Sequence, residues 1–206
     1  MTDLHWAADG SDAGVVAHVA AVVARPGPVK LCFPGGATPR PIFAALAMML
    51  LPWDKATIIP GDEREVPHDD PASNVGQLRA AFGATGATIE PLSVTSPVPR
   101  FDLVWLGMGS DGHVASLFPG TTLTTTAAVI ALTPDPLPRE APFNRLTLTL
   151  AAFSNCDNTI LVIRGDAKRR LLVAAASSDN NLPIARLLAL APVTVFWSDE
   201  RSQKRR

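Results

Sequence analysis

The chain has 206 residues, of which 47% are hydrophobic and 18% are charged, and this composition excludes intrinsic disorder as the main state. With 18 Lys and Arg against 19 Asp and Glu, the net charge of -1 provides no basic field for nucleic acid or an anionic membrane. We expect neither as a partner. No internal repeat is present, and we expect a single domain over residues 1–206.

The sequence also lacks the marks of a secreted, membrane or zinc-binding protein. Cys32 and Cys156 lie far apart, without a CxxC pair or a histidine cluster, so no disulfide framework or zinc site is predicted. The first ten residues resemble no signal peptide, and the longest apolar run, 42–51, is far shorter than the ~20 residues of a membrane span. We expect an untargeted cytoplasmic protein and, because composition indicates no interface patch, a monomer.

Helix signals and apolar, β-branched runs alternate along the chain. Ser11 or Asp12 caps the first helix, and Pro39 and Pro41 introduce the second. The predicted elements are, in order, helix 13–24, strand 29–33, helix 40–50, strands 57–60, 103–106 and 159–163, helices 166–177 and 182–190, and strand 193–197. Such alternation is typical of βαβ units. The sequence therefore predicts one three-layer α/β domain with a mostly parallel sheet flanked by helices.

The loop PGGATP, residues 34–39, follows the first predicted strand and precedes a helix. Ligands of open parallel sheets bind where strands end, so this position is significant. Gly35 and Gly36 let backbone N–H groups approach an anion, the helix N-terminus adds partial positive charge, and Thr38 offers a hydroxyl. The pattern favours a phosphate cradle and an ordinary tight turn about equally.

The loop GDEREVPHDDPASN, residues 61–74, gathers charges after the next strand. Carboxylates beside Arg64 could hold its guanidinium as a rigid fork for phosphate or carboxylate, although a solvated charge run is the alternative. His68, Asp69 and Asp70 match no standard ligand spacing, so no metal site is predicted.

The loop GMGSDGHVASLFPG, residues 107–120, carries the strongest signal in the chain. His113 follows Asp111 by two positions among four glycines, and imidazole can accept a proton from water near neutral pH. The neighbouring backbone N–H groups could hold a developing oxyanion. A buried histidine bonded to a carbonyl is the alternative. Because no GxSxG elbow is present, hydrolysis by activated water fits better than a nucleophilic side chain.

A fourth segment, GDAK at residues 165–168, also lies between a strand and a helix. Lys168 would occupy the first helical turn, where its charge opposes the helix dipole. This position suggests an anion nearby, and an ordinary surface lysine is the alternative.

Taken in order, PGGATP, GDEREVP with Ser73 and Asn74, GMGSDGHVASLFPG, NRLTLTL and GDAK resemble the 6-phosphogluconolactonases. These belong to a superfamily that also includes the glucosamine-6-phosphate deaminases. The resemblance spans nearly the whole chain. It implies a Rossmann-like α/β fold and hydrolysis of 6-phosphoglucono-δ-lactone, a small sugar-phosphate lactone of the oxidative pentose phosphate pathway, without metal or cofactor.

The resemblance also implies roles for individual residues. His113 matches the general base that activates water and returns the proton to the ring oxygen, and Asp111 would orient it. The residues that would bind the phosphate group or the sugar are Gly35, Gly36, Thr38, Arg64 and Lys168, with Asn74 and Arg145 as further contacts. Remote binding of this kind would position the lactone carbonyl against the base.

Three departures from the family pattern bear on the site. Pro34 and Ala37 replace residues that are usually serines, which removes two hydroxyls and one N–H from the phosphate loop. Residues 75–99 are shorter than the family norm, and we expect no helix there. Leu117 and Phe118 stand near the position of the deaminases' catalytic glutamate. An amino-sugar-phosphate isomerase or deaminase, and a non-catalytic sugar-phosphate sensor, are the alternatives to a lactonase.

Overall fold

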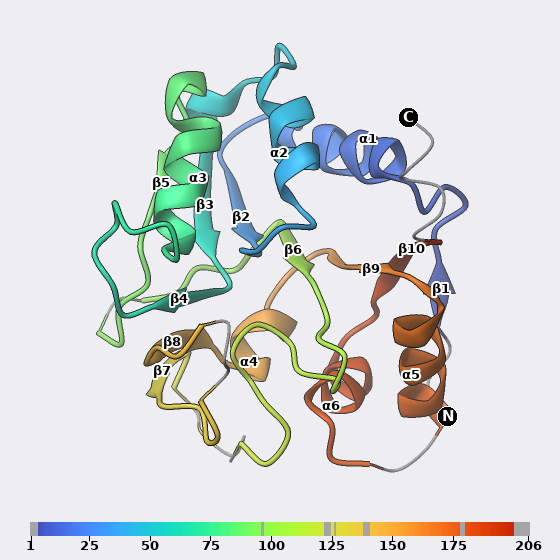
Figure 1. Cartoon of the computed structure of the whole chain (residues 1–206). Coiled ribbons are helices and arrows are strands. Elements are labelled where there is room, and N and C mark those ends of the chain that lie inside the picture. The colour runs from blue at the N-terminus through green and yellow to red at the C-terminus, as the bar shows by residue number, and fades with distance from the viewer. Residues whose placement is uncertain are drawn as a thin grey trace.

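The computed structural model describes residues 4–95, 97–121, 125, 127–137, 141–177 and 180–199. Its centre is a seven-stranded sheet in which each neighbouring pair of strands is parallel (Figure 1). The strands lie in the spatial order β1 (His5–Trp6), β10 (Thr194–Ser198), β9 (Thr159–Arg164), β6 (Leu103–Leu106), β2 (Val29–Phe33), β3 (Ala56–Pro60) and β5 (Thr88–Ile89).

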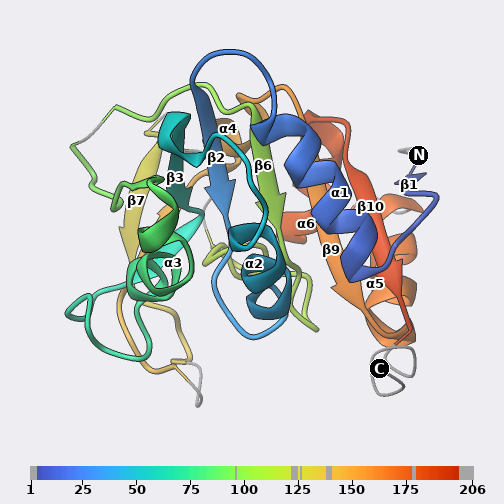
Figure 2. The same ribbon diagram turned by 90° about the horizontal axis from the view of Figure 1, so that it is seen from above.

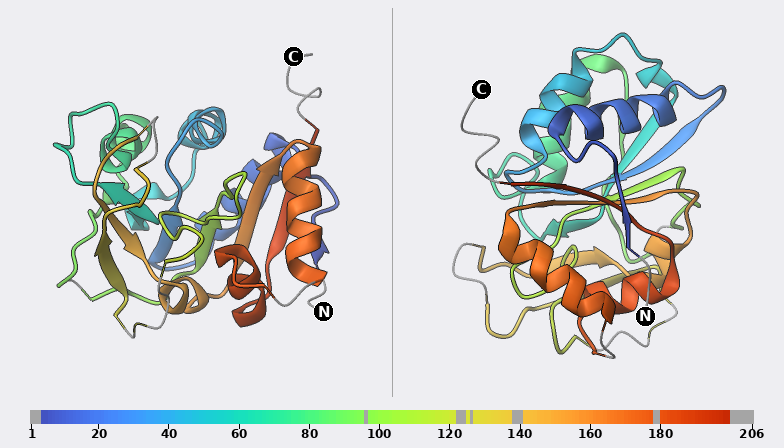
Figure 3. Two further views of the ribbon diagram at one scale, coloured as in Figure 1. Left: turned by 60° about the horizontal axis from the view of Figure 1, so that its bottom comes forward. Right: turned by 90° about the vertical axis from the view of Figure 1, so that its right-hand side faces the viewer.

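Helices cover both faces of this sheet (Figures 2 and 3). One face carries α1 (Asp12–Val23), α2 (Arg40–Ala47) and α3 (Asn74–Phe82), and the other carries α4 (Leu150–Ser154), α5 (Asp166–Ser177) and α6 (Pro183–Leu190). No helix in the described part of the chain is long and apolar enough to cross a membrane.

The period of two along each strand divides the core between the faces. Leu31 and Phe33 of β2 belong to the cluster formed with α1, α2 and α3, whereas Cys32 belongs to the cluster on the opposite face. All three side chains are fully buried, because helices cover the sheet on both sides. The predicted three-layer α/β fold with a mostly parallel sheet is confirmed.

A smaller antiparallel sheet lies beside the large one and contains β4 (Asp62–Arg64), β8 (Arg145–Leu148) and β7 (Val129–Leu132). The chain passes from β3 of the large sheet to β4 through Gly61, and Arg64 pairs with Arg145 of β8. The small sheet therefore fixes the charged segment after β3 against the edge of the main sheet.

Two predicted helix features differ from the structure. The helix predicted over 40–50 ends at Ala47, and Met48 and Leu50 are exposed beyond its end. The expectation of no helix within residues 75–99 is wrong, because α3 begins at Asn74 and continues to Phe82. Ser73 caps α3 by accepting a hydrogen bond from the Gly76 N–H, and Leu78 and Phe82, four residues apart, are fully buried.

Candidate active site

A cleft of about 500 Å³ opens at the carboxyl edge of the large sheet, beyond β2, β6 and β9. The loops singled out in the sequence meet there, as expected for an open parallel sheet. Seven of the nine predicted site residues line it, namely Gly35, Gly36, Thr38, Arg64, Asn74, His113 and Lys168. Asp111 and Arg145 are not part of the lining.

His113 and Asp111 form a hydrogen-bonded pair on the loop after β6. The His113 Nδ1 lies 2.7 Å from the Asp111 Oδ1, and the His113 N–H donates to the same oxygen at 3.2 Å. The imidazole is one-third exposed and packs against Phe118, with 4.9 Å between the ring centroids. A carboxylate at Nδ1 favours a proton on that nitrogen and leaves Nε2 as the basic one. The geometry is therefore that of an oriented base, and the alternative of a carbonyl-bonded buried histidine does not apply.

The same pair affects Asp111. Partial burial by itself raises the pKa of Asp111, but the hydrogen bonds and the charge of His113 outweigh burial, so the pKa lies below its ordinary value. Asp111 is consequently anionic wherever the protein would work near neutral pH.

Glycine is required at two points of this loop. A Cβ on Gly109 would overlap the His113 imidazole, and Gly112 has φ +85°. The loop's amides, however, are largely occupied: the Gly109 N–H donates to the His113 carbonyl, and the Gly112 N–H donates to the Gly109 carbonyl. The expectation that amides beside His113 hold an oxyanion is therefore wrong for Gly109, Gly112 and His113 itself.

The phosphate-loop candidate forms one wall of the cleft. Gly35 packs so closely against Asn74 that a Cβ would overlap its side-chain amide, and Gly36 has φ +94°. Thr38 is exposed, and α2 begins two residues later. The loop thus exposes backbone and one hydroxyl at the start of a helix, which suits an anion.

Arg64 enters the cleft from β4, but carboxylates do not hold it as predicted. Its Nη1 donates to the Ala72 carbonyl at 2.5 Å, and its buried Nε has no hydrogen-bond partner. The carboxylate of Glu63, which is 5% exposed, instead accepts from four donors around the start of α3: the N–H groups of Arg64, Asn74 and Val75 and the hydroxyl of Ser73. Glu63 thereby ties β4 to α3 behind the cleft.

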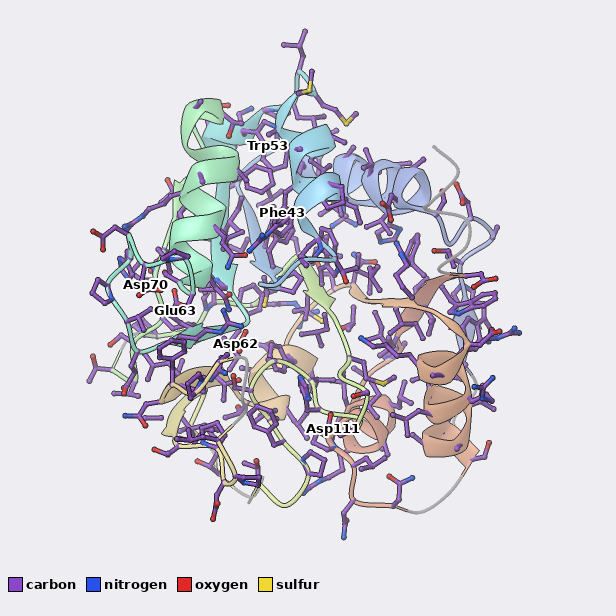
Figure 4. All side chains as sticks on the ribbon, in the orientation of Figure 1. Phe43, Trp53, Asp62, Glu63, Asp70 and Asp111 are labelled. Atoms are coloured by element: carbon purple, nitrogen blue, oxygen red, sulfur yellow. The ribbon has the colours of Figure 1, made fainter. Side chains whose placement is uncertain are left out.

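Asp62 and Asn74 form a second buried group that reaches the cleft. The Asn74 Nδ2 donates to the Asp62 carbonyl at 2.8 Å and to its Oδ1 at 3.0 Å, while the Asn74 Oδ1 is buried without a partner. Ser116 donates its hydroxyl to the other carboxylate oxygen of Asp62. Figure 4 shows Asp62 and Glu63 side by side on β4, with Asp111 on the separate loop after β6.

The last two predicted residues have different positions. Lys168 lines the cleft from the first turn of α5, as the sequence predicted. Arg145 is buried in β8, where its Nη2 donates to the Ala141 carbonyl. Burial, followed by the nearby charge of Arg64, lowers the pKa of Arg145. Arg145 therefore lies behind Arg64 in the small sheet and is not a wall of the cleft.

Three cleft-associated residues were not predicted: Asp62, Ser116 and Arg164. Asp62 was visible only as part of a charge run, and Ser116 is a single serine in a loop. Arg164 is a lone arginine at the end of an apolar strand, which carries no pattern. Among the described residues, no group of three His, Cys, Asp or Glu side chains is placed to hold a metal ion.

The fold and cleft define the class of the protein: an α/β protein whose cleft at the carboxyl edge of the sheet has an oriented histidine, a glycine loop and cations in its walls. A model of the glucosamine-6-phosphate isomerases/6-phosphogluconolactonase family matches residues 6–95 and 84–197. The chain belongs to this family.

Individual relatives agree. The chain is 36% identical to a 6-phosphogluconolactonase of Caulobacter vibrioides, covering 93% of this chain and 92% of the relative. It is 32% identical to a 6-phosphogluconolactonase of Rhizobium meliloti, covering 89% and 90% of the two chains. The crystal structure of a 6-phosphogluconolactonase from Shewanella baltica superposes with a TM-score of 0.81 and 29% identity, covering 96% of this chain and 98% of the other.

Proposed function

We propose that this protein is a 6-phosphogluconolactonase, which hydrolyses 6-phosphoglucono-δ-lactone to 6-phosphogluconate in the oxidative pentose phosphate pathway. The observation that carries the proposal is the His113–Asp111 pair, oriented at 2.7 Å, in the same cleft as the glycine loop, Arg64 and Lys168. Family membership and the names of the relatives support the same activity.

The chemical step begins at His113. Its Nε2 takes a proton from a water molecule while the water oxygen bonds to the lactone carbonyl carbon, which gives a tetrahedral oxyanion and an imidazolium. The oxyanion then collapses, the bond from C1 to the ring oxygen breaks, and the imidazolium returns its proton to that oxygen. Asp111, anionic at neutral pH, stabilises the imidazolium and keeps the ring oriented. The new carboxylic acid releases one proton to solvent, which provides an assay.

The phosphate group would be bound at the opposite end of the cleft. Gly35 and Gly36 present backbone, Thr38 a hydroxyl, and Arg64 and Lys168 positive charge. Arg64 and Asn74 also line the cleft, so the Arg64 guanidinium could donate to phosphate or sugar oxygens and the Asn74 side chain could contact a sugar hydroxyl. Binding the remote phosphate fixes the carbonyl beside His113 and lowers the barrier through orientation.

Deaminase chemistry has less support. Near the position where the sequence resemblance places the deaminases' glutamate, Leu117 is fully buried and Phe118 packs on the His113 ring. Neither side chain can donate a proton to open a sugar ring.

We further propose that the protein acts as a cytoplasmic monomer. The composition indicates no interface patch, which favours a monomer. Cys32 and Cys156 are unpaired, which suits a reducing compartment. Light scattering of the purified protein, and its distribution between cell fractions, test these two points.

The test of the activity is proton release from freshly generated 6-phosphoglucono-δ-lactone, with and without the protein. We expect a rate well above spontaneous hydrolysis, and no ammonia from glucosamine 6-phosphate under the same conditions. Binding of 6-phosphogluconate with only the spontaneous rate would favour the sensor, and ammonia release would favour the deaminase.

A further inference from the structure

Arg164 is the most deeply embedded cation of the cleft. It ends β9, it lines the same cleft as Thr38 and Lys168, and only 9% of it is exposed. Its Nη1 donates to the carbonyls of Ile163 and Phe196 at 3.0 and 3.1 Å, and its Nη2 forms an ion pair with Asp12 at 2.7 Å. The guanidinium is therefore held in one orientation by the ends of β9 and β10 and the start of α1.

One donor of this guanidinium has no acceptor. The Arg164 Nε is buried and makes no hydrogen bond. Six buried side-chain polar atoms in the described residues share this condition, and three of them belong to cleft-lining residues: Arg64, Asn74 and Arg164. Buried polar groups are normally satisfied, so a set of unsatisfied ones around a single cleft indicates a ligand that supplies the missing partners.

The composition of the phosphate loop is a second reason to expect a further cation in this cleft. Within PGGATP, Pro34 has no N–H and Ala37 has no hydroxyl, so Thr38 supplies the single side-chain donor of the loop. A dianionic phosphate bound there would receive only one side-chain hydrogen bond from the loop, besides those from its backbone N–H groups. A preoriented arginine in the same cleft compensates, because its planar donors suit phosphate.

We propose that Arg164 is a third phosphate-binding cation of this cleft, in addition to Arg64 and Lys168, with Asp12 as its ion-pair partner. The ligand class is a sugar phosphate or another small phosphate ester. The inference rests on the proposed function for the identity of the ligand. Because Asp12 shares the charge of Arg164, it also limits the affinity of the cleft for anions.

A purely structural role is the competing explanation, since the Asp12 pair joins α1 to the end of β9. The two explanations predict different changes in anion affinity for a pair of variants. Arg164→Met and Asp12→Asn both abolish the ion pair, but one removes a positive charge from the cleft and the other removes a negative charge. A binding role therefore predicts opposite changes in anion affinity, whereas a structural tie predicts the same change from both variants.

The experiment is calorimetric titration of the full-length wild type and variants with 6-phosphogluconate and, separately, with inorganic phosphate. We expect Arg164→Met to weaken binding about ten- to hundredfold, the loss of one charge-assisted contact, and Asp12→Asn to leave binding equal or tighten it a few-fold. Arg164→Lys should fall between wild type and Arg164→Met. Arg100→Met, which removes an exposed ion pair with Asp157 away from the cleft, is the matched control and should change nothing.

Binding that Arg164→Met leaves unchanged, or that both Arg164→Met and Asp12→Asn weaken alike, overturns the inference while leaving the lactonase proposal intact. Failure of the wild type to bind either anion overturns both. Should Arg164→Met not fold, Asp12→Asn decides, because a structural tie predicts weaker binding in that variant and a binding role predicts equal or tighter binding. In turnover assays the effect belongs in KM, with kcat changed less than twofold.

Discussion

Two cavities lie at opposite ends of the same strands, and each contains a histidine. The cleft at the carboxyl edge, about 500 Å³, has His113, a glycine loop and three cations in its walls. The cavity at the amino edge, about 200 Å³, has His18 together with residues that begin β9 and β10, and none of the described lysines or arginines lines it.

The two histidines differ in what surrounds them. His113 bonds to a carboxylate through Nδ1, whereas the buried Nε2 of His18 has no hydrogen-bond partner and its ring packs edge-on against Phe196. Burial, followed by the charge of Arg25, lowers the pKa of His18. A histidine in a cavity is therefore not enough for catalysis. The carboxylate that orients it and the cations that position a substrate distinguish the candidate site.

The largest expected effect separates these histidines directly. His113→Ala removes the base and should lower kcat for 6-phosphoglucono-δ-lactone about a hundred- to ten-thousandfold. His18→Ala, the matched control, should leave kcat within twofold. Initial rates of proton release measure both variants. Comparable losses of kcat in the two would contradict the assignment of His113 as the base.

The next effect concerns substrate binding. Arg64→Met and Lys168→Met each remove a charge-assisted contact of about 1.5–3 kcal/mol, which should raise KM about ten- to hundredfold with a smaller change in kcat. Arg100→Met, near the amino edge, should leave KM unaltered. Unchanged KM in both cleft variants would remove phosphate from the proposed binding mode.

Asp111→Asn should lower kcat about tenfold, because the imidazolium loses its anionic partner. Initial rates of proton release measure this loss.

The Asp111–His113 pair should also make the stability of the fold depend on pH. The pKa of Asp111 is lowered in the folded protein from an ordinary value of 3.8, so its carboxylate stabilises the fold above that value. Thermal melts should show wild type above Asp111→Asn at neutral pH, and the difference should vanish as acid protonates the carboxylate. A Tm difference between wild type and Asp111→Asn that grows in acid would contradict this prediction.

The smallest effect concerns stability, and it compares one carboxylate near each cavity, Glu63 and Asp157. Glu63→Gln breaks a buried acceptor of four hydrogen bonds and should cost about 1.5–3 kcal/mol of stability, seen as a Tm lower by roughly 3–10 °C. Asp157→Asn removes only an exposed ion pair at the other cavity and should cost less than about 1 kcal/mol. Equal costs would mean that Glu63 does not secure β4 to α3.

The sequence predicted the fold well where local chemistry decides the structure. Apolar β-branched runs gave the five central strands to within a residue or so, and α5 has the predicted bounds. The helix over 40–50 was too long because apolar composition continues through Met48 and Leu50 after the backbone has turned away. Helix α3 was not predicted because residues 75–99 are shorter than the family norm, although Ser73 caps a helix there.

Site residues could be predicted where they lie in loops that follow strands. They could not be predicted where the pairing of two strands decides whether a side chain reaches the cleft. His113, Arg64 and Lys168 come from loops or strand ends at the functional edge, and the topology brings them together. Arg145 lies outside the cleft because its register opposite Arg64 places it in the small sheet, which no local pattern reveals. Arg164 depends on a contact with Asp12, far away in sequence, so only the folded chain identifies it.

A crystal structure of the protein with bound 6-phosphogluconate tests the central claim most directly. We predict the phosphate group at residues 34–39 between Arg64 and Lys168, and the C1 carboxylate within one water molecule of the His113 Nε2. A ligand bound with its C1 end turned away from His113, or bound outside this cleft, would contradict the assignment.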